Sequence, residues 1–470
     1  MQRKITPADA AGVARAEPRE AGTILVEAGR EAADLASRLE RLRASTEVGA
    51  QRVIVLQEEE GATLPPRFTS PDVLFLPRAH AEIALGEVRT DKVAFLPAGA
   101  TLDAPPWDEL TDDGASVMFW LPETPVARHT ATERAVDKRC WLASASLLRG
   151  LSELGGCADW ETLRVAAAAR RAGREVRWRS PAVTVAAGDV APAHEGGPAP
   201  LNEESEVAAL VPHYRCEEWL SQCLESVLSQ TRPPSAVVVI DDCSERPPVE
   251  IIGRYEGVTL LRSAENVSWC RLVQEAIDQT GYTAYLFQDA DDWAAGDRLE
   301  ILLKEAERTG AELIGSQELR VVDEGVEVLA VSYPLDVSRA YAEFEGHPLL
   351  HPTSLISRDL VRRSGGFSTA LRFGADSEFF WRVSHLARIA NVPRYSYFRR
   401  RREGALTTDP ETGLGSVARE TLGRDLRRWA ELNREALARG ELRADEIKPY
   451  AKAPPVRLTH LLGPRLKPAG

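Results

Sequence analysis

The sequence predicts an α/β protein whose sheets are mainly parallel and covered by helices. Short apolar runs of strand length alternate with longer segments that carry apolar residues at helical spacing. The alternation stops near residue 186 and restarts near residue 207. Such alternation is typical of βαβ units, in which a helix connects neighbouring parallel strands. We therefore expect two α/β domains in succession.

The composition describes an acidic, globular protein. Of 470 residues, 44% are hydrophobic and 27% charged, which allows two or three domains with cores of their own. The net charge of −13 argues against a nucleic-acid partner, because phosphate contacts need clustered Lys and Arg. We expect neither a secretory signal nor a transmembrane segment. The six cysteines show no zinc spacing, so reduced thiols in a cytoplasmic protein are expected.

The first predicted domain covers residues 21–185 and follows a flexible arm, residues 1–20. Its strand-like runs are Thr23–Val26, Val53–Leu56, Val73–Leu76 and Val93–Leu96. Between the first two runs, residues 32–42 place Leu35, Leu39 and Leu42 on one face of a predicted helix. Residues 186–206 are rich in Ala, Gly, Pro and Glu, which predicts an interdomain linker.

The second predicted domain covers residues 207–410 and places acidic residues after two strands. The strand 236–240 leads into Asp241 and Asp242, and the strand 284–287 leads into three further aspartates, Asp289, Asp291 and Asp292. In doubly wound sheets, ligands bind beyond the carboxyl ends of the strands, so both clusters should face one crevice. Their mutual repulsion is best relieved by a hard divalent cation. The alternative is a helix N-terminus capped by Asp291 or Asp292.

Residues 207–408 resemble the family 2 inverting glycosyltransferases of the GT-A fold. Five segments in the family's order carry the resemblance: Val211-Pro-His-Tyr-Arg215, Ser226-Val-Leu-Ser-Gln-Thr231, Val239-Ile-Asp-Asp-Cys-Ser244, Gln288-Asp-Ala-Asp-Asp292, and Gly365-Gly-Phe367 with Gly374-Ala-Asp-Ser-Glu378. The resemblance implies a Rossmann-like, mainly parallel sheet and a nucleotide-sugar donor, most simply a UDP-sugar. It also implies Mn²⁺ or Mg²⁺ as cofactor and a hydroxyl acceptor on a glycan, lipid or peptide.

The resemblance also implies roles for single residues. Pro212, Tyr214 and the pair Asp241 and Asp242 would hold the nucleobase. Arg271 is a candidate phosphate contact, although its segment departs from the family's glycine-bearing pattern. Asp289 would face the ribose or the metal, Asp291 would ligate the metal, and Asp292 would support that site. An aromatic face and an acceptor for a ring N–H are what a uracil requires.

An inverting transfer also needs a carboxylate that takes the proton of the acceptor hydroxyl. Asp376 matches the aspartate of the family's Glu-Asp motif, although Ala375 stands in place of the glutamate. Glu378 is the fallback base. The alternative use of Asp376 is as N-cap of a helix over residues 377–385.

Cationic and hydroxyl side chains near residue 400 match the family's closing segment. The resemblance implies that Arg401, Arg402 and Thr407 cover the diphosphate, since guanidinium groups bind phosphate oxygens bidentately. A solvated basic strand end is the alternative. His351 could reach the metal or the diphosphate, but a lone histidine often has a structural role.

The first domain has features of a degenerate copy of the second. A gapless alignment matches Val26 with Val211, and further alignments match Val93 with Ala284, Ser144 with Ser354, and residues 155–156 and 158–161 with residues 365–366 and 375–378. Ala98 and Ala100 then replace Asp289 and Asp291, so the first copy would hold no metal. It would orient an acceptor or build a homo-oligomer. The alternative is an unrelated α/β domain that shares only periodicity.

Two segments come after the second domain. Residues 411–447 predict a helical segment in which Leu422, Leu426, Trp429 and Leu432 form an apolar stripe that packs on the second domain. Residues 448–470 form a basic tail, predicted to be a solvated, disordered segment or to touch an anionic membrane surface from the cytoplasmic side.

Taken together, the sequence predicts a metal-dependent inverting glycosyltransferase of glycan or glycoconjugate synthesis. A sugar nucleotidyltransferase would need a Gly-rich phosphate loop after the first strand, and Pro212-His-Tyr-Arg215 is not such a loop. A non-catalytic carbohydrate-binding or scaffold protein is the other alternative. The intact acidic residues of the second domain argue against it.

Overall fold

The computed structural model divides the chain into two compact units. Unit 1 consists of residues 1–122 and 139–176, and unit 2 of residues 123–138 and 177–470. The structure describes residues 23–27, 52–57, 73–77, 88, 90–96, 110, 114–119, 121, 131–137, 139–149, 151, 161–182, 200–322, 325, 327–343 and 346–470. The expected helix over residues 32–42 lies outside these residues, as does most of the expected linker.

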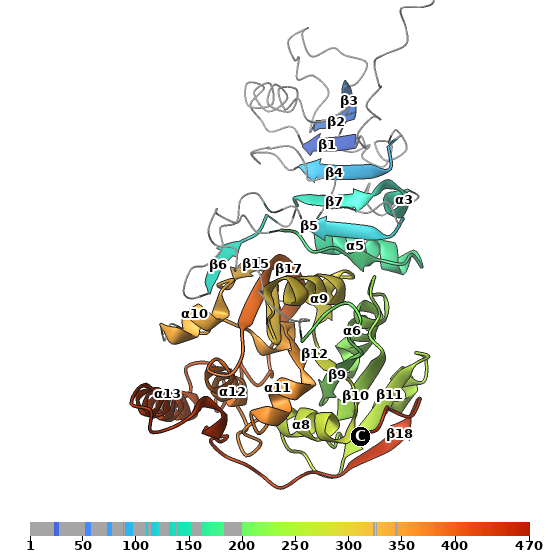
Figure 1. Cartoon of the computed structure of the whole chain (residues 1–470). Coiled ribbons are helices and arrows are strands. Elements are labelled where there is room, and N and C mark those ends of the chain that lie inside the picture. The colour runs from blue at the N-terminus through green and yellow to red at the C-terminus, as the bar shows by residue number, and fades with distance from the viewer. Residues whose placement is uncertain are drawn as a thin grey trace, which may run out of the picture. The chain divides into compact units, whose positions relative to one another are not determined.

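Unit 2 is built on a mixed sheet with a parallel centre. Its strands run in the order β13-β17-β14-β16-β12-β9-β10-β11-β18, with β15 paired to β14 (Figure 1). The bounds of these strands are β9 Val207–His213, β10 Ala236–Asp241, β11 Val258–Ser263, β12 Ala284–Phe287, β13 Trp293–Ala294, β14 Leu313–Val322, β15 Glu327–Ser332, β16 Leu355–Ser357, β17 Ile389–Arg401 and β18 Leu458–Leu462. The neighbours β12, β9, β10 and β11 are parallel, whereas β16 and β18 run antiparallel to them.

Helices cover both faces of this sheet. Residues of β9 alternate between two buried clusters, with Ala209 and Val211 on one face and Ala208 and Leu210 on the other. Helices α6 (Glu217–Leu228) and α9 (Arg298–Thr309) pack on the first face. Helices α8 (Trp269–Gln279), α11 (Arg358–Arg363) and α12 (Ala375–Val383) pack on the second. The remaining helices are α7 Val249–Ile252, α10 Val337–Ala342, η6 His351–Thr353, α13 Val417–Ala438 and η7 Ala444–Glu446.

The parallel centre determines where the polar loops meet. Asp241 at the end of β10 is opposite His213 at the end of β9, and Phe287 at the end of β12 is opposite Leu210. The residues immediately after these strands therefore emerge at one edge of the sheet, as the sequence predicted.

Unit 1 repeats the strand order of this centre. Its sheet runs β3-β2-β1-β4-β7-β5, where β1, β2, β3 and β4 are parallel and β7 is antiparallel to β4 and β5. The order and the senses match β11-β10-β9-β12-β16-β14 of unit 2. The bounds are β1 Thr23–Glu27, β2 Arg52–Gln57, β3 Val73–Pro77, β4 Lys92–Leu96, β5 Ser116–Phe119, β7 Trp141–Ser144, α3 Ala145–Leu148 and α5 Thr162–Arg171.

The strand register corrects two of the expected alignments. If Val26 matches Val211, Thr23 matches Ala208. These two residues pair with Val93 and Tyr285 respectively, so Val93 corresponds to Tyr285 rather than to Ala284.

One strand further, Val93 pairs with Ala143 and Tyr285 with Ile356. Ser144 therefore corresponds to Ser357 rather than to Ser354, and both serines are the N-caps of the helices that come after them. Continued along the sequence, this register sets Pro97 and Gly99, instead of Ala98 and Ala100, against Asp289 and Asp291. Residues 97–100 and 152–160 lie outside the described residues.

The boundary between the units differs from the expected one because two segments of residues 21–185 pack on unit 2. Strand β6 (Thr132–Ala135) pairs with β15, although its residues belong to the middle of the expected first domain. Trp178, in β8 (Arg177–Trp178), lies against Phe398 with ring centroids 4.9 Å apart. Leu201, from the end of the expected linker, is buried in the core of unit 2.

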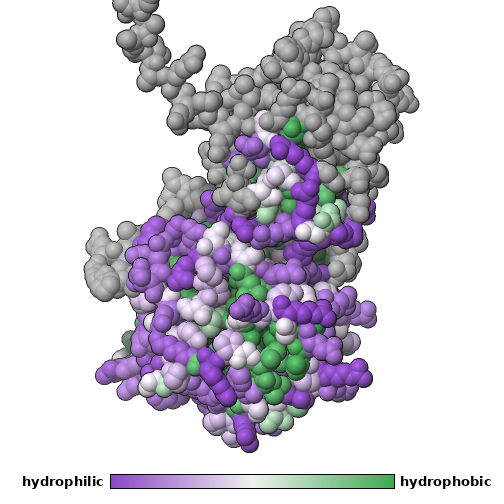
Figure 2. Space-filling view, turned by 90° about the vertical axis from the view of Figure 1, so that its right-hand side faces the viewer, coloured by the Kyte–Doolittle hydropathy of each residue, from purple (hydrophilic) through white to green (hydrophobic). Residues whose placement is uncertain are grey.

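The C-terminal segments also belong to unit 2. Leu426 of α13 is buried and Leu422 packs beside it, as expected, whereas Leu432 is 47% exposed. The basic tail is not a free segment, because its residues 458–462 form β18 on the edge of the sheet. Figure 2 shows the side on which β18 lies, where hydrophilic residues predominate and hydrophobic ones gather in one area of unit 2. Among the described residues, no helix combines the length and hydrophobicity that crossing a bilayer requires.

Candidate active site

A cavity of about 360 Å³ lies at the carboxyl ends of β9, β10 and β12. Its wall includes the loops after these three strands, the start of α8, η6, the start of α12, the end of β17 with residues 404–407, and Arg419 of α13. Most of the residues that the sequence predicted for donor, metal and acceptor chemistry line it. These are Pro212, Tyr214, Asp242, Asp289, Asp291, Asp292, His351, Asp376, Arg402 and Thr407.

Three aspartates form one wall of the cavity. Oxygen atoms of Asp289, Asp291 and Asp292 all lie within 4.8 Å of one another. The Tyr397 hydroxyl donates to Asp292 Oδ2 at 2.8 Å, and the Arg400 backbone N–H donates to Asp292 Oδ1 at 2.7 Å. Arg402 Nε donates to Asp291 Oδ2, also at 2.8 Å. Both oxygens of Asp292 are thus engaged by the protein, which leaves Asp289 and Asp291 as the better ligands.

Two of the three aspartates have raised pKa values, as expected for carboxylates crowded at one site. Burial, followed by the neighbouring charge of Asp291, raises the pKa of Asp289 to about 7. Burial and the same neighbour raise the pKa of Asp292 well above its usual value. A divalent cation with oxygen preference would relieve this repulsion, so the donor set fits Mn²⁺ or Mg²⁺.

A second wall is suited to a nucleobase. The Asp242 carboxylate accepts hydrogen bonds from the Val267 backbone N–H at 2.8 Å and from Asn266 Nδ2 at 3.2 Å. Burial raises the pKa of Asp242 to about 6. Tyr214 is 41% exposed at the cavity, and the guanidinium carbon of Arg215 lies 5.1 Å from its ring centroid. A carboxylate and an aromatic face therefore line the same cavity.

Asp241 does not line the cavity, in contrast to the prediction. It is fully buried, accepts from His213 Nδ1 at 3.2 Å, and lies 3.5 Å from Arg262 Nε. Burial raises its pKa, but hydrogen bonds from His213 and Ser244 outweigh this and bring it below the usual value. The neighbouring Cys216 backbone N–H donates to His213 Nε2. Asp241 therefore holds the ends of β9 and β10 together.

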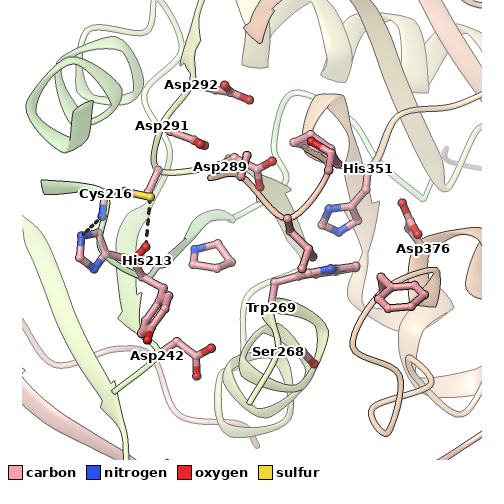
Figure 3. A pocket seen from close by; sticks show the side chains of 18 of the residues that line it. His213, Cys216, Asp242, Ser268, Trp269, Asp289, Asp291, Asp292, His351 and Asp376 are labelled. Carbon is pink, nitrogen blue, oxygen red and sulfur yellow. Dashed lines mark hydrogen bonds between the residues drawn. The ribbon is translucent and has the colours of Figure 1, made fainter. Parts of the chain in front are cut away.

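Asp376 faces the cavity from the side opposite Asp242, beyond His351 (Figure 3). It is the second residue of α12, whose N-cap is Gly374 with a φ of 75°, so the N-cap alternative for Asp376 is wrong. The Ser377 N–H donates to Asp376 Oδ1 at 2.9 Å. Glu378 is excluded as fallback base, because it is buried away from the cavity and paired with Arg382 at 2.7 Å.

Two predicted arginines also lie outside the cavity wall. Arg401, the last residue of β17, is exposed, whereas Arg399, Arg400 and Arg402 line the cavity. Arg271 donates to the Pro454 carbonyl at 2.9 Å and so binds the C-terminal segment.

His351 is a wall residue with a mainly structural environment. Its ring lies 4.0 Å from that of Trp269 and 4.2 Å from that of Phe287, centroid to centroid. Burial lowers its pKa to about 3, so the ring is neutral at ordinary pH. Its Nε2 atom has no hydrogen-bond partner among the described residues.

Sequence reasoning missed several wall residues: Trp269, Arg372, Arg399, Arg400 and Arg419. Trp269 and Arg372 lie beside recognised segments and could have been considered. Arg419 comes from a helix 43 residues after Asp376 with no motif around it, so only the fold reveals its position.

Comparison with known proteins agrees with this geometry. Residues 208–351 match the family model described as glycosyl transferase family 2, so this part of the chain is a family 2 glycosyltransferase domain. Glycosyltransferase GlyA of Streptococcus pneumoniae is 27% identical over 104 residues, which is 22% of this chain and 15% of that protein. The putative teichuronic acid biosynthesis glycosyltransferase TuaG of Bacillus subtilis is 26% identical over 98 residues, which is 20% of this chain and 39% of that protein.

Solved structures show more distant likeness. A crystal structure of S. aureus TarS residues 1–349 with UDP-GlcNAc is 21% identical, with a TM-score of 0.36, over 43% of this chain and 60% of that one. The mannosyltransferase PcManGT of Pyrobaculum calidifontis, with GDP-Man and Mn²⁺, is 18% identical, with a TM-score of 0.35, over 45% and 61%. The alignments thus cover less than two thirds of each of these relatives.

Proposed function

We propose that unit 2 is a metal-dependent inverting glycosyltransferase that moves a sugar from a nucleoside diphosphate to a hydroxyl acceptor. One observation carries the proposal. Asp289 and Asp291 face one cavity together with Asp242 and Asp376, which approach it from two further sides (Figure 3). A sugar nucleotide needs contacts to its base, its diphosphate and its anomeric carbon at such separated places.

Donor binding is assigned to the walls beside Asp242 and Asp291. The Asp242 carboxylate would accept the N3–H of a uracil, and Tyr214 would stack on the ring, which favours a UDP-sugar. Arg400 and Arg402 supply guanidinium groups beside Asp291, where the diphosphate would lie. Arg402 is held by stacking, with its guanidinium carbon 4.4 Å from the ring centroid of Trp219. Thr407 would cover the diphosphate on the side of the cavity formed by Arg400 and Arg402.

Mn²⁺ or Mg²⁺ would be held by Asp291 and Asp289, with Asp292 fixed behind them by Tyr397 and Arg400. When bound, such an ion neutralises the charge that develops on a departing diphosphate. The carboxylates alone would repel a diphosphate, so donor binding should depend on the added cation.

Asp376 is assigned the role of base. Its carboxylate would take the proton of the acceptor hydroxyl as that oxygen bonds to the anomeric carbon and the bond from this carbon to the diphosphate breaks. Attack from the face opposite the diphosphate inverts the configuration at the anomeric carbon. The position of Asp376, away from the aspartates of the metal wall, supports this direction of attack.

The proposal is tested by donor hydrolysis. The full chain should release nucleoside diphosphate from one or more of a panel of UDP-, GDP- and dTDP-sugars in the presence of MnCl₂ and lose this activity with EDTA. Turnover of no sugar nucleotide, or turnover that Asp291→Ala leaves unchanged, would contradict the proposal and favour a non-catalytic binding protein.

A further inference from the structure

Cationic side chains to which the proposed reaction gives no role line the cavity together with Asp376, the residue assigned to the acceptor. Arg372 and Arg419 line the cavity near Asp376. Arg372 comes four residues before Asp376, and Arg419 is the third residue of α13. Neither arginine forms an ion pair with a described residue. Arg399 also lines the cavity, but its charge is compensated by buried Glu318, 3.9 Å away, and by Asp289 and Asp292.

The guanidinium of Arg419 is held in place by its neighbours, but one of its nitrogens has no hydrogen-bond partner among the described residues. Its Nε donates to the Thr412 carbonyl at 2.7 Å, and its Cζ lies 4.8 Å from the ring centroid of Phe373. Its Nη2 is buried and has no hydrogen-bond partner within the part of the chain that the structure describes. A buried cationic N–H without an acceptor is costly and uncommon. A fixed donor of this kind is suited to an anionic ligand.

The neighbourhood indicates which part of the reaction this ligand belongs to. The diphosphate is assigned to the wall of Asp291 and Arg402. Arg372 and Phe373 precede Asp376 in the sequence and line the cavity with it, and Arg419 lies against Phe373. Burial lowers the pKa of Arg419, and the negative charge of Asp376 partly offsets this. An anion held by these arginines would therefore lie next to the hydroxyl that Asp376 deprotonates.

We propose that Arg372 and Arg419 form a subsite for an anionic group, a phosphate or a carboxylate, that the acceptor carries near its reacting hydroxyl. This inference rests on the proposed function, because it presumes that Asp376 meets the acceptor. It names the acceptor as a charged glycan or polyol phosphate rather than a neutral sugar. Guanidinium groups bind both anions through paired, charge-assisted hydrogen bonds. The same chemistry could serve the donor diphosphate, and the test separates the two sources.

The test measures binding to the full chain by titration calorimetry after saturation with UDP and MnCl₂, which fills the donor side. The probes are glycerol 3-phosphate and glucuronate, with glycerol and glucose as their neutral counterparts. We expect the anionic probes to bind more tightly than the neutral ones. Arg419→Gln and Arg372→Gln should each weaken anion binding about tenfold, the loss expected for a charge-assisted hydrogen bond. Both variants should change UDP affinity less than about twofold.

Arg427→Gln is the matched control, because Arg427 is an exposed arginine of the same helix that does not line the cavity. It should leave anion binding unchanged. Equal binding of neutral and anionic probes, no anion binding by the wild type, or a loss confined to UDP affinity would each overturn the subsite. If UDP with MnCl₂ fails to bind the wild type, the proposed function itself fails. Since Arg419→Gln also removes the bond to Thr412, Arg372→Gln provides an independent reading should Arg419→Gln fold poorly.

Discussion

The two units share a sheet order but differ in the loops at the carboxyl ends of their strands. In unit 2, the parallel strands β10 and β12 lead into Asp241 and Asp242 and into Asp289, Asp291 and Asp292. In unit 1, the corresponding β4 leads into Pro97, Ala98, Gly99, Ala100 and Thr101, none of which carries a carboxylate. The sheet supplies an edge where loops converge, and the residues of those loops decide whether chemistry is present.

The loss in unit 1 is selective. The strand register matches Arg52 with Ala236 and therefore Glu58 with Asp242. An acidic residue thus remains at the position that is assigned to the nucleobase in unit 2. Gly29 stands where Tyr214 would be, and the metal carboxylates have no counterpart. We propose that unit 1 is a duplicated, degenerate copy that cannot hold a metal-bound diphosphate. The shared strand order supports this over an unrelated domain, since common periodicity alone does not fix a strand order.

The largest effect should come from removal of a metal ligand from unit 2. Asp291→Ala should lower donor turnover by about a thousandfold, because several kcal/mol of stabilisation of the leaving group are lost. Steady-state hydrolysis of the sugar nucleotide measures the rate, and calorimetry should show that Mn²⁺ binding is lost as well.

The matched control lies in unit 1. Asp103 is the first carboxylate after β4 in the sequence, so Asp103→Ala should change neither the rate nor the Mn²⁺ stoichiometry. Tight Mn²⁺ binding that survives Asp291→Ala but is lost with Asp103→Ala would mean that unit 1 holds the metal. It would contradict the proposed difference between the two units.

The next effect concerns the base. Asp376→Asn should slow transfer to an acceptor by about a hundredfold, because the hydroxyl proton loses its recipient. Affinity for UDP with Mn²⁺ should remain, since Asp376 lies away from that wall. Glu420→Gln, an exposed change on α13, is the control. Unchanged transfer by the Asp376 variant would assign the proton to another group and remove the reason for the proposed direction of attack.

The sequence was sufficient for the parts of the fold that depend on local pattern. Apolar runs located the parallel strands β1, β2, β3 and β4 of unit 1 and β9, β10 and β12 of unit 2, but not β11. Asp242, Asp289, Asp291 and Asp376 all reach one cavity. Pairings between distant segments were not predictable. Nothing near β6 or β18 in the sequence indicates that each adds to the sheet of unit 2, because a strand partner has no local signal.

The same reason explains the errors among the site residues. Asp241 and Glu378 have the right type and neighbourhood in the sequence. Each is instead hydrogen-bonded to a buried partner, His213 or Arg382, that only the folded chain brings near. Arg401 stands in the sequence among three arginines that line the cavity, Arg399, Arg400 and Arg402, and only the folded chain shows that Arg401 is exposed. Conversely, no sequence pattern places Arg419 in the site, and only the folded chain brings this residue of α13 to the cavity.

A smaller effect should arise from Asp242 and should depend on pH. Its pKa of about 6 means that the carboxylate gains a proton as pH falls through 6 and loses the charge that strengthens its bond to the uracil N–H. UDP affinity, measured with Mn²⁺ present, should therefore fall below pH 6. Asp242→Asn should bind UDP about tenfold more weakly at pH 7.5, with a flatter dependence on pH. An identical pH profile in the variant would show that Asp242 does not bind the nucleobase.

The smallest effect is on stability, and it arises from the site of unit 2. Asp289 and Asp242 have folded pKa values of about 7 and about 6, above their unfolded value, so the folded chain binds more protons than the unfolded one as pH falls. The metal-free protein should gain about 1 kcal/mol from Asp289 between pH 8 and pH 6, which raises its thermal midpoint by a few degrees.

Below pH 6.5, His351 changes the free energy of unfolding in the opposite direction to the two carboxylates. His351 has a folded pKa of about 3, so the unfolded chain binds the proton and stability is lost as pH falls from 6.5 towards 3. This loss should offset part of the gain that Asp289 and Asp242 provide below pH 6.5. Saturating MnCl₂ should remove the rise between pH 8 and pH 6, because bound cation keeps the carboxylates charged, and Asp289→Asn should flatten it. A rise that persists in this variant would have to come from groups elsewhere in the chain, and the assignment of this titration to the unit 2 site would be wrong.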